Sequence, residues 1–251
     1  MYEERTMKVK TKTPRISLPI IQATWNNCTK CEIGKHCRQK VFYDDLGDFR
    51  FQNETIDILF IGEAPGTIED VEGTPFVGPA GQLLRKAIKE AGTECPNCKG
   101  IGTIRIDTGF TTIDSYGSHK MKPCPLCTQQ GFISIGFTNL IACRPYSTNP
   151  RSPTNRPPLL GEINNCSQRL VDTIVTMNPV FIVALGKEAA DSLPNVVYEL
   201  GKKGIIVQTA RLLHPSYILR KGNIVSEKEY VDSLSQVFYN YWKYMEELNK
   251  D

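Results

Sequence analysis

The feature that most constrains the fold is an apolar run that ends in a glycine-rich loop and leads into a helix pattern. The run covers residues 56–61 and has the composition of a strand buried on both faces. The loop opens with Gly62-Glu63-Ala64-Pro65-Gly66, and the amphipathic helix pattern covers residues 82–90. Open α/β sheets are built from such units and bind ligands at the carboxyl ends of their strands. The sequence therefore predicts a ligand site at this loop.

Three further apolar runs have the length and composition of core strands. They cover residues 132–143, 179–185 and 204–207, and the last continues through residues 208–213. Helix patterns follow at residues 162–177 and 187–193, and from Ser226, where Glu229 completes a capping box. Strands that alternate with helices predict a four-stranded parallel sheet with helices on both faces, an α/β fold.

Length and charge limit what the chain can be. A chain of 251 residues holds one sizeable α/β domain, or one domain with an insertion. The net charge of +3 gives no global field that points to nucleic acid. Residues 1–15 read as a flexible basic tail, with contact to a nucleic acid backbone as the alternative. Since no secretory signal or membrane span is found, we expect a cytoplasmic protein.

Nine cysteines are many for a cytoplasmic chain, where Cys-x-x-Cys indicates metal ligation before disulfides. Two such pairs lie in residues 93–132, which read as an insertion into a domain formed by residues 1–92 and 133–251. The pairs are Cys95/Cys98 and Cys124/Cys127, and they predict a structural zinc site in a zinc-ribbon-like module, with iron as the alternative. The run after Cys95 resembles the zinc knuckles of DnaJ chaperones, without implying their function. Whether the module contacts DNA or a partner stays open.

Three motifs, in order, resemble the uracil-DNA glycosylase superfamily, and most closely family 4, the iron–sulfur uracil-DNA glycosylases. The first runs from Gly62 to Gly81, the second is Thr138-Asn139 leading to Cys143-Arg144-Pro145, and the third is His214-Pro215-Ser216. Order and approximate spacing fit over nearly the whole chain, except residues 93–131. The resemblance implies a three-layer α/β/α sandwich with a four-stranded parallel sheet. It also implies that the protein, which we expect to be a monomer, hydrolyses the N-glycosidic bond of a flipped-out uracil in DNA.

The resemblance assigns roles to residues around the base. His214 matches the hydrogen-bond donor to the O2 atom of the departing base, whose negative charge such a donor stabilises. Asn139 matches the amide that pairs with the base edge, and Phe76 matches the ring that stacks on the base. Small residues leave room for the base at Gly62, Ala64 and Gly66. Either Glu63 or Glu69 orients the water, or Glu69 instead guards the 5-position of the base.

The resemblance also suggests DNA contacts and a second metal site. Ile218 falls where the superfamily places an apolar wedge, and the candidate backbone contacts are Ser216, Arg220, Lys221 and, in the loop after the second motif, Arg144. A structural 4Fe–4S cluster would be held by Cys28, Cys31, Cys143 and Cys166. Zinc is the alternative at these cysteines, because sequence alone does not separate the two kinds of site. Cys37 is left over, as a plain thiol or as a replacement for Cys31.

Two other functions stay open from the sequence. The insertion at residues 93–132 departs from the compact form of the family and follows the first helix, so it offers a way to admit a modified pyrimidine instead of uracil. The other alternative is a non-catalytic module that binds DNA or a replication partner. Covalent trapping of DNA is not expected, because residues 198–213 contain no histidine.

Overall fold

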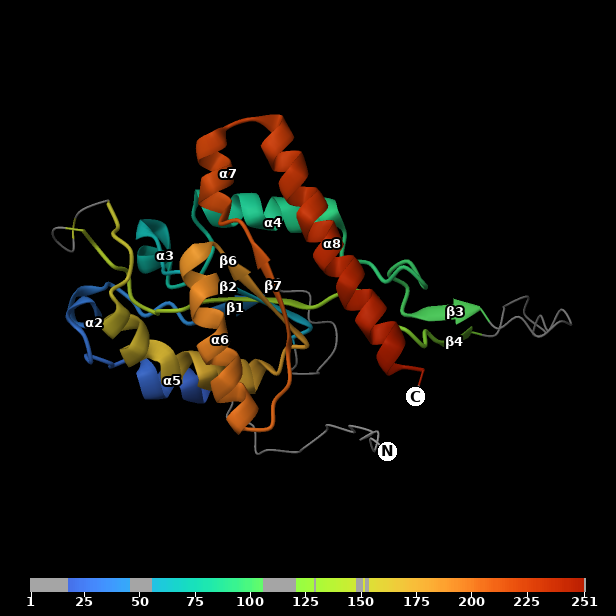
Figure 1. The fold of residues 1–251 in the computed structure, drawn as a ribbon, viewed down its shortest axis with the longest axis horizontal. Coiled ribbons are helices and arrows are strands. Elements are labelled where there is room, and N and C mark those ends of the chain that lie inside the picture. The colour runs from blue at the N-terminus through green and yellow to red at the C-terminus, as the bar shows by residue number, and fades with distance from the viewer. Residues whose placement is uncertain are drawn as a thin grey trace, which may run out of the picture.

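A computed structural model describes residues 18–45, 56–105, 121–128, 130–147, 151 and 154–250. Its main sheet has five strands in the order β1-β5-β2-β6-β7 (Figure 1). Four run parallel, namely β5 (Ile135–Asn139), β2 (Ile58–Gly62), β6 (Phe181–Leu185) and β7 (Gln208–Leu212). They confirm the predicted parallel core. The short edge strand β1 (Tyr43–Asp45) is antiparallel to β5, so the sheet is mixed and has one strand more than predicted.

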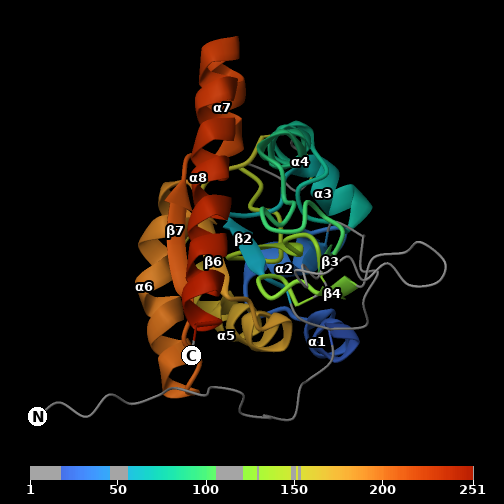
Figure 2. The same ribbon diagram turned by 90° about the vertical axis from the view of Figure 1, so that its right-hand side faces the viewer.

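Helices cover both faces of this sheet, which confirms the three-layer α/β/α prediction (Figures 1 and 2). One layer contains α4 (Pro79–Ala91), α7 (Pro215–Lys221) and α8 (Ile224–Leu248). The other contains α5 (Leu160–Met177) and α6 (Lys187–Lys202), with α1 (Leu18–Trp25) packed on α5. Two short helices complete the described fold, α2 (Glu32–His36) and α3 (Thr67–Glu72). No helix among the described residues is long and apolar enough to cross a membrane.

The side chains of β2 point alternately to the two faces of the sheet, which explains why this strand is apolar at every position. Ile58 and Phe60 belong to the core shared with α4 and α8, whereas Leu59 and Ile61 belong to the core shared with α5 and α6. Successive side chains of a strand point to opposite faces, so a strand covered on both sides has no position for a polar residue. All five residues of β2 are buried as a result.

Several element boundaries differ from the prediction. The fourth parallel strand is residues 208–212, so it begins later than the predicted run, which started at residue 204 and continued to 213. Helix α6 continues past Pro194, because Val196 and Leu200 beyond it are buried against the sheet and this packing outweighs the lost backbone hydrogen bond. Helix α8 begins at Ile224 instead of Ser226, since the side chain of Asn223 accepts a hydrogen bond from the Ser226 amide at 2.7 Å and forms the cap.

Residues 93–132, which the sequence predicts to be an insertion, begin and end side by side at the amino ends of the parallel strands. The ends of this segment are joined where the Ile133 amide donates to the Thr93 carbonyl at 2.8 Å. Within it, β3 (Thr103–Arg105) pairs with β4 (Met121–Pro123). Asp57, just before β2, accepts from the Ser134 amide at 2.7 Å and from the Gln130 side chain at 2.5 Å. The segment also reaches the end of α8, where the Asn249 side chain donates to the Pro125 carbonyl at 3.0 Å (Figure 1).

Candidate active site

A cleft of about 380 Å³ opens at the carboxyl ends of the parallel strands, where the sequence predicts a ligand site. Three strand ends contribute to it. Strand β2 ends at Gly62 and continues into Glu63, β5 ends at Asn139, and His214 follows β7. Residues of α3 and α4 and of the loop before α5 complete the lining. Residues that are far apart in the sequence therefore meet in one cavity.

Two side chains of the cleft, those of Asn139 and Phe76, pack directly against the backbone of Gly62. A Cβ atom on Gly62 would lie 2.5 Å from Asn139 Oδ1 and 2.6 Å from Phe76 Cζ. Contacts this short do not occur between real atoms, so the amide and the ring reach these positions only because residue 62 has no side chain. The small residue predicted here is needed to bring Asn139 and Phe76 together.

The Phe76 backbone is held in a conformation that residues other than glycine rarely adopt. Its φ angle is 57°, in the left-handed region. Gly81 in the first turn of α4 permits this, because a Cβ there would lie 2.1 Å from the Phe76 carbonyl oxygen. Arg85 Nε donates to the same carbonyl oxygen at 3.0 Å, and the Phe76 ring packs on Phe137 with 5.6 Å between ring centroids. Strain fixed by its surroundings is typical of functional positions.

Asn139 is held by a buried arginine that sequence reasoning missed. The Arg169 side chain is only 1% exposed and comes from α5. Its Nη2 donates to the carbonyl oxygens of Asn139 at 2.6 Å and Leu140 at 2.8 Å, and its Nη1 donates to Thr138 Oγ1 at 3.0 Å. These hydrogen bonds from α5 hold the carboxyl end of β5 in place. The available signal was an arginine next to Leu170 on the apolar face of the predicted helix 162–177.

His214 caps α7 and is held in one neutral form. The Ser216 amide donates to His214 Nδ1 at 3.2 Å, and Ser216 Oγ lies 2.8 Å from the same atom. Because Nδ1 accepts from the main chain, the proton of the neutral ring sits on Nε2. Burial, with a smaller contribution from the charge of Arg220, lowers the pKa of His214 to about 4. At neutral pH the ring therefore offers an uncharged Nε2–H donor to a ligand.

The structure distinguishes the surroundings of Glu63 and Glu69, the two carboxylates that the sequence left as alternatives. Glu69 Oε1 accepts from the Gly78 amide at 2.8 Å, and a Cβ on Gly66 would lie 2.5 Å from Glu69 Oε2. Glu69 therefore braces the loop and the start of α4. The side chain of Glu63 lines the cleft and has no hydrogen-bond partner among the described residues, since the bond from the Ile141 amide goes to the backbone carbonyl. Burial, followed by the charge of Glu188, raises the pKa of Glu63. Glu63 is the carboxylate that is available to a water molecule.

The loop before α5 supplies a wall of the cleft that was not predicted. Asn155 lines the cleft, accepts from Arg144 Nε at 2.7 Å and donates to the Pro65 carbonyl oxygen at 3.3 Å. This side chain ties the loop to the one that follows β2. Next to it, Arg156 lines the cleft and forms an ion pair with Glu162. The sequence showed only a surface loop rich in proline and arginine.

Of the residues predicted to contact DNA, two are buried in the structure. Ile218 and Arg144 are each only 3% exposed: Ile218 packs in the core with α4 and α8, and Arg144 holds Asn155. Both side chains are therefore enclosed by protein in this structure, and contact with DNA stays a prediction for them. Arg220 and Lys221 are exposed on α7, and Arg220 Nη1 lies 3.3 Å from Ser216 Oγ.

The cysteines of the insertion form a group that can hold a metal ion. The sulfur atoms of Cys95, Cys98, Cys124 and Cys127 all lie within 4.8 Å of one another. Cys95 and Cys124 sulfurs are 3.8 Å apart, close to the ~3.8 Å edge of a tetrahedron with metal–sulfur bonds of about 2.3 Å. Backbone amides support two of the sulfurs: Gly102 donates to Cys98 at 3.2 Å and Gly131 to Cys127 at 3.3 Å. The described residues of the insertion line no part of the cleft.

The other predicted ligand cysteines come together beside the cleft. Cys31, Cys143 and Cys166 pack around Ile33 and Ile141, together with the cleft residue Ala64. The backbone of Cys28 joins them at Gly34, where a Cβ atom would lie 3.1 Å from the Cys28 carbonyl oxygen and 3.9 Å from the Cys143 sulfur. The apolar surroundings and the close approach at Gly34 fit a bound cluster. The left-over Cys37 lies here too, and its sulfur accepts from Lys40 Nζ at 3.1 Å.

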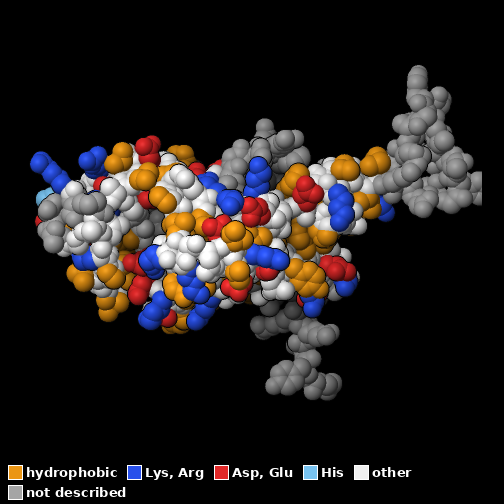
Figure 3. Space-filling view, turned by 90° about the horizontal axis from the view of Figure 1, so that it is seen from above, with side chains coloured by type: hydrophobic (Ala, Val, Ile, Leu, Met, Phe, Trp, Pro, Cys, Tyr) orange, Lys and Arg blue, Asp and Glu red, His pale blue; other side chains and the backbone are white. Residues whose placement is uncertain are grey.

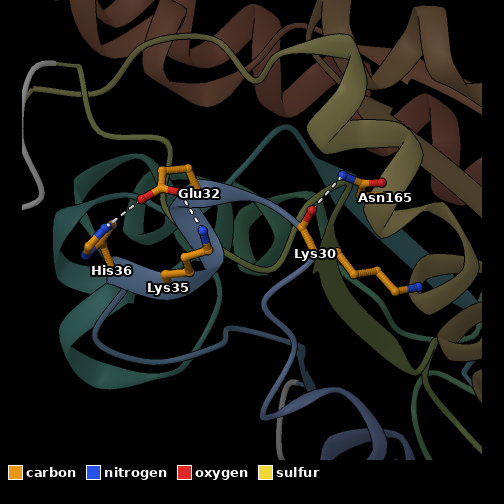
Figure 4. A network of polar contacts seen from close by, with 5 residues as sticks. All are labelled: Lys30, Glu32, Lys35, His36 and Asn165. Atoms are coloured by element: carbon orange, nitrogen blue, oxygen red, sulfur yellow. Dashed lines mark hydrogen bonds and ion pairs between the residues drawn. The ribbon is translucent and has the colours of Figure 1, made fainter.

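Figure 4 shows a hydrogen bond between Lys30, which lies in the segment of the first cysteine pair, and Asn165 of α5. Asn165, the neighbour of Cys166, donates from Nδ2 to the Lys30 carbonyl oxygen, next to Cys31, at 3.1 Å (Figure 4). Glu32 begins α2 and binds Lys35 and His36, each at 2.9 Å (Figure 4). The segments that carry the two ends of the cysteine set are therefore linked by a direct hydrogen bond.

Comparison with known proteins identifies the family. The family model of the uracil DNA glycosylase superfamily matches residues 49–238. A type-4 uracil-DNA glycosylase of Archaeoglobus fulgidus is 28% identical over 217 residues, which cover 81% of this chain and 83% of that protein. The Pyrobaculum aerophilum enzyme of the same name is 27% identical, covering 80% and 84%. The Saccharolobus solfataricus one is 30% identical, covering 70% of this chain and 59% of that protein.

Proposed function

This chain belongs to the uracil DNA glycosylase superfamily, and on that premise we propose that it hydrolyses the N-glycosidic bond of uracil in DNA. The observation that carries the proposal is the convergence of Asn139, Phe76 and His214 on one cleft. An amide, an aromatic ring and a neutral donor are the groups needed to recognise, stack and activate a flipped-out pyrimidine.

The chemistry follows from these groups. As the bond between C1′ and N1 breaks, its electron pair moves to the base, and negative charge develops on O2. His214 donates a hydrogen bond from Nε2–H to this oxygen. A neutral imidazole suits this role because it keeps its proton, and so remains a hydrogen-bond donor, throughout the reaction. Asn139 accepts from the N3–H of uracil and donates to O4, which cytosine would not satisfy. Phe76 stacks on the ring of the base.

Glu63 is the residue that we propose for positioning the water. Its carboxylate lines the cleft without a protein partner, whereas that of Glu69 is engaged by Gly78. The water adds to C1′ and passes its proton to the carboxylate or to solvent. Because the sugar carries positive charge in the transition state, little base strength is required. No lysine is among the described residues that line the cleft, which supports a monofunctional enzyme without a Schiff-base step.

We assign the two cysteine groups to different metals. Cys95, Cys98, Cys124 and Cys127 have the spacing for one tetrahedral zinc ion. The sulfur atoms of Cys28, Cys31, Cys143 and Cys166 are not gathered so tightly within the described chain, and a four-iron cluster holds its cysteine sulfurs farther apart than a single ion does. Both groups would be structural. The reducing cytoplasm accords with nine cysteines that form no disulfide, and we further propose that the protein acts as a monomer.

The test is base release by metal-replete protein, with iron and zinc counted on the same sample. Single-stranded and duplex oligonucleotides carry uracil, thymine or 5-substituted pyrimidines, and the released bases are identified by mass. We expect uracil to be released, and this release to fall at least 100-fold in His214→Ala and Asn139→Ala, as for lost transition-state donors. Lys202→Gln, at the far end of α6, is the control. Tight DNA binding with no base released would refute the proposal, and release of 5-substituted bases alone would refute uracil as the substrate.

A further inference from the structure

Arg156 is the only arginine or lysine among the described residues that line the cleft. The other charged residues of this lining are the carboxylates Glu63 and Glu69, and His214 is neutral. On the face shown in Figure 3, basic and acidic side chains are interspersed. A polyanion that approaches this cleft therefore meets the positive charge of Arg156 rather than a broad basic surface.

The guanidinium of Arg156 is bound along one edge only. Its Nη1 donates to Glu162 Oε2 at 2.8 Å and to the Pro157 carbonyl oxygen at 3.0 Å, and its Nη2 donates to Glu162 Oε1 at 2.6 Å. The Nε–H and the second Nη2–H find no acceptor among the described residues. These two N–H groups lie side by side on the remaining edge, and such a pair matches two oxygens of a phosphate. The side chain is 28% exposed and lines the cleft, so a ligand in the cleft has access to the guanidinium.

Glu162 holds the guanidinium ready for a ligand. Its carboxylate is buried in the first turn of α5 and also accepts from the Leu159 amide at 2.8 Å. The hydrogen bonds from Arg156 lower the pKa of Glu162, so the carboxylate stays ionised at neutral pH. An arginine that is already fixed loses less conformational entropy when it binds an anion.

We propose that Arg156 binds a backbone phosphate of the DNA strand next to the flipped nucleotide. A base that enters the cleft brings the phosphates on either side of it to the rim, close to Glu63 and Glu69, where a cation must offset the repulsion. This inference rests on the proposed function, because it takes a DNA strand as the ligand.

The test is the salt dependence of binding. The probe is a fluorescein-labelled single-stranded oligonucleotide with one 2′-fluoro-2′-deoxyuridine, whose electron-withdrawing fluorine slows cleavage. Each phosphate contact on a single strand adds about 0.7 to the slope of log K against log salt concentration. We expect Arg156→Gln to lower the slope by about 0.7 and to weaken binding about tenfold in dilute salt. Arg156→Lys keeps the charge and should keep the slope.

Two further variants make the result specific. Arg156→Gln leaves the buried Glu162 without its cation, so Arg156→Gln/Glu162→Gln removes both charges and should show the same loss of slope if the protein remains folded. Lys202→Gln breaks an exposed ion pair with Glu199 at the far end of α6 and should leave the slope unchanged.

An unchanged slope in folded Arg156→Gln and Arg156→Gln/Glu162→Gln would overturn the inference, even if uracil release fell, because the residue would then act on the structure or on the chemical step. Failure of the proposed function looks different. In that case the wild-type protein would release no uracil, while the slope would still depend on Arg156.

Discussion

The replacement of Gly62 by alanine is the sharpest test of the pocket geometry. The backbone at this position accepts alanine without strain, since its φ angle is not in the left-handed region. The new Cβ, however, would lie 2.5 Å from Asn139 Oδ1 and 2.6 Å from Phe76 Cζ. Because non-bonded carbon atoms approach to about 3.5 Å, each side chain must retreat by roughly 1 Å.

The size of the effect follows from this displacement. A shift of about 1 Å in positioning groups costs around 100-fold in rate. We therefore expect kcat/KM for uracil release from a single-stranded oligonucleotide to fall by about 100-fold or more in Gly62→Ala. Overpacking of one methyl group costs about 1–3 kcal/mol of unfolding free energy, so the variant should remain folded.

Two glycines provide matched controls. A Cβ on Gly161 or Gly201 would meet nothing within 4 Å, and both residues lie in helices. Their replacement by alanine should leave kcat/KM unchanged and raise stability by up to about 1 kcal/mol. If Gly62→Ala kept activity within threefold of the wild type while the thermal unfolding curve showed a folded protein, the argument that Gly62 positions Asn139 and Phe76 would be wrong.

Three other predictions concern His214, Arg169 and the cysteine group for which we propose zinc. With the pKa of His214 lowered to about 4, kcat/KM should show no titration of this residue near its usual pKa of about 6.5. The folded state binds fewer protons than the unfolded one between these values, so the unfolding free energy that His214 contributes should be lost as pH falls from about 6.5 to 4, a loss absent in His214→Gln. Arg169→Met removes the donor to the buried carbonyl oxygens of Asn139 and Leu140 and to Thr138 Oγ1, and should cost about 3–5 kcal/mol in urea unfolding, whereas an effect below 1 kcal/mol would contradict the bonds described. Cys124→Ala should lower zinc content and melting temperature while uracil release below the melting temperature changes less than threefold, and a large loss of activity would show that the module supports the cleft.

The core of the fold and the centre of the cleft could be predicted because each depends on a local pattern. A strand buried on both faces must be apolar at every position, as β2 is, and a glycine is needed wherever two side chains close on the backbone, as at Gly62. The motifs that carry Asn139 and His214 follow strands, so a parallel sheet brings them to one edge.

Other parts of the site depend on contacts between distant segments, which a sequence pattern does not encode. Arg156 looked like any arginine of a surface loop until the structure placed it against Glu162 at the cleft. Ile218 shows a second kind of tertiary effect: its place in a motif suggested contact with DNA, and the register of α7 places it in the core of this structure, which the motif did not show. Glu63 and Glu69 were equivalent in the sequence, and one hydrogen bond from Gly78 distinguishes them.

The spacing along α5 explains how a structural cluster can matter for catalysis without any electron transfer. Glu162, Cys166 and Arg169 are four and then three residues apart, so they lie on one side of the helix. Glu162 fixes Arg156 at the cleft, Arg169 fixes the end of β5 behind Asn139, and Cys166 lies between them in the predicted cluster site. A ligand bound to Cys166 would therefore fix the position of this part of α5 relative to the sheet. Loss of a cluster at these cysteines is expected to displace Arg156 and Asn139 together. The reason is that Glu162, which holds Arg156, and Arg169, which holds the Asn139 carbonyl oxygen, lie on the same helix.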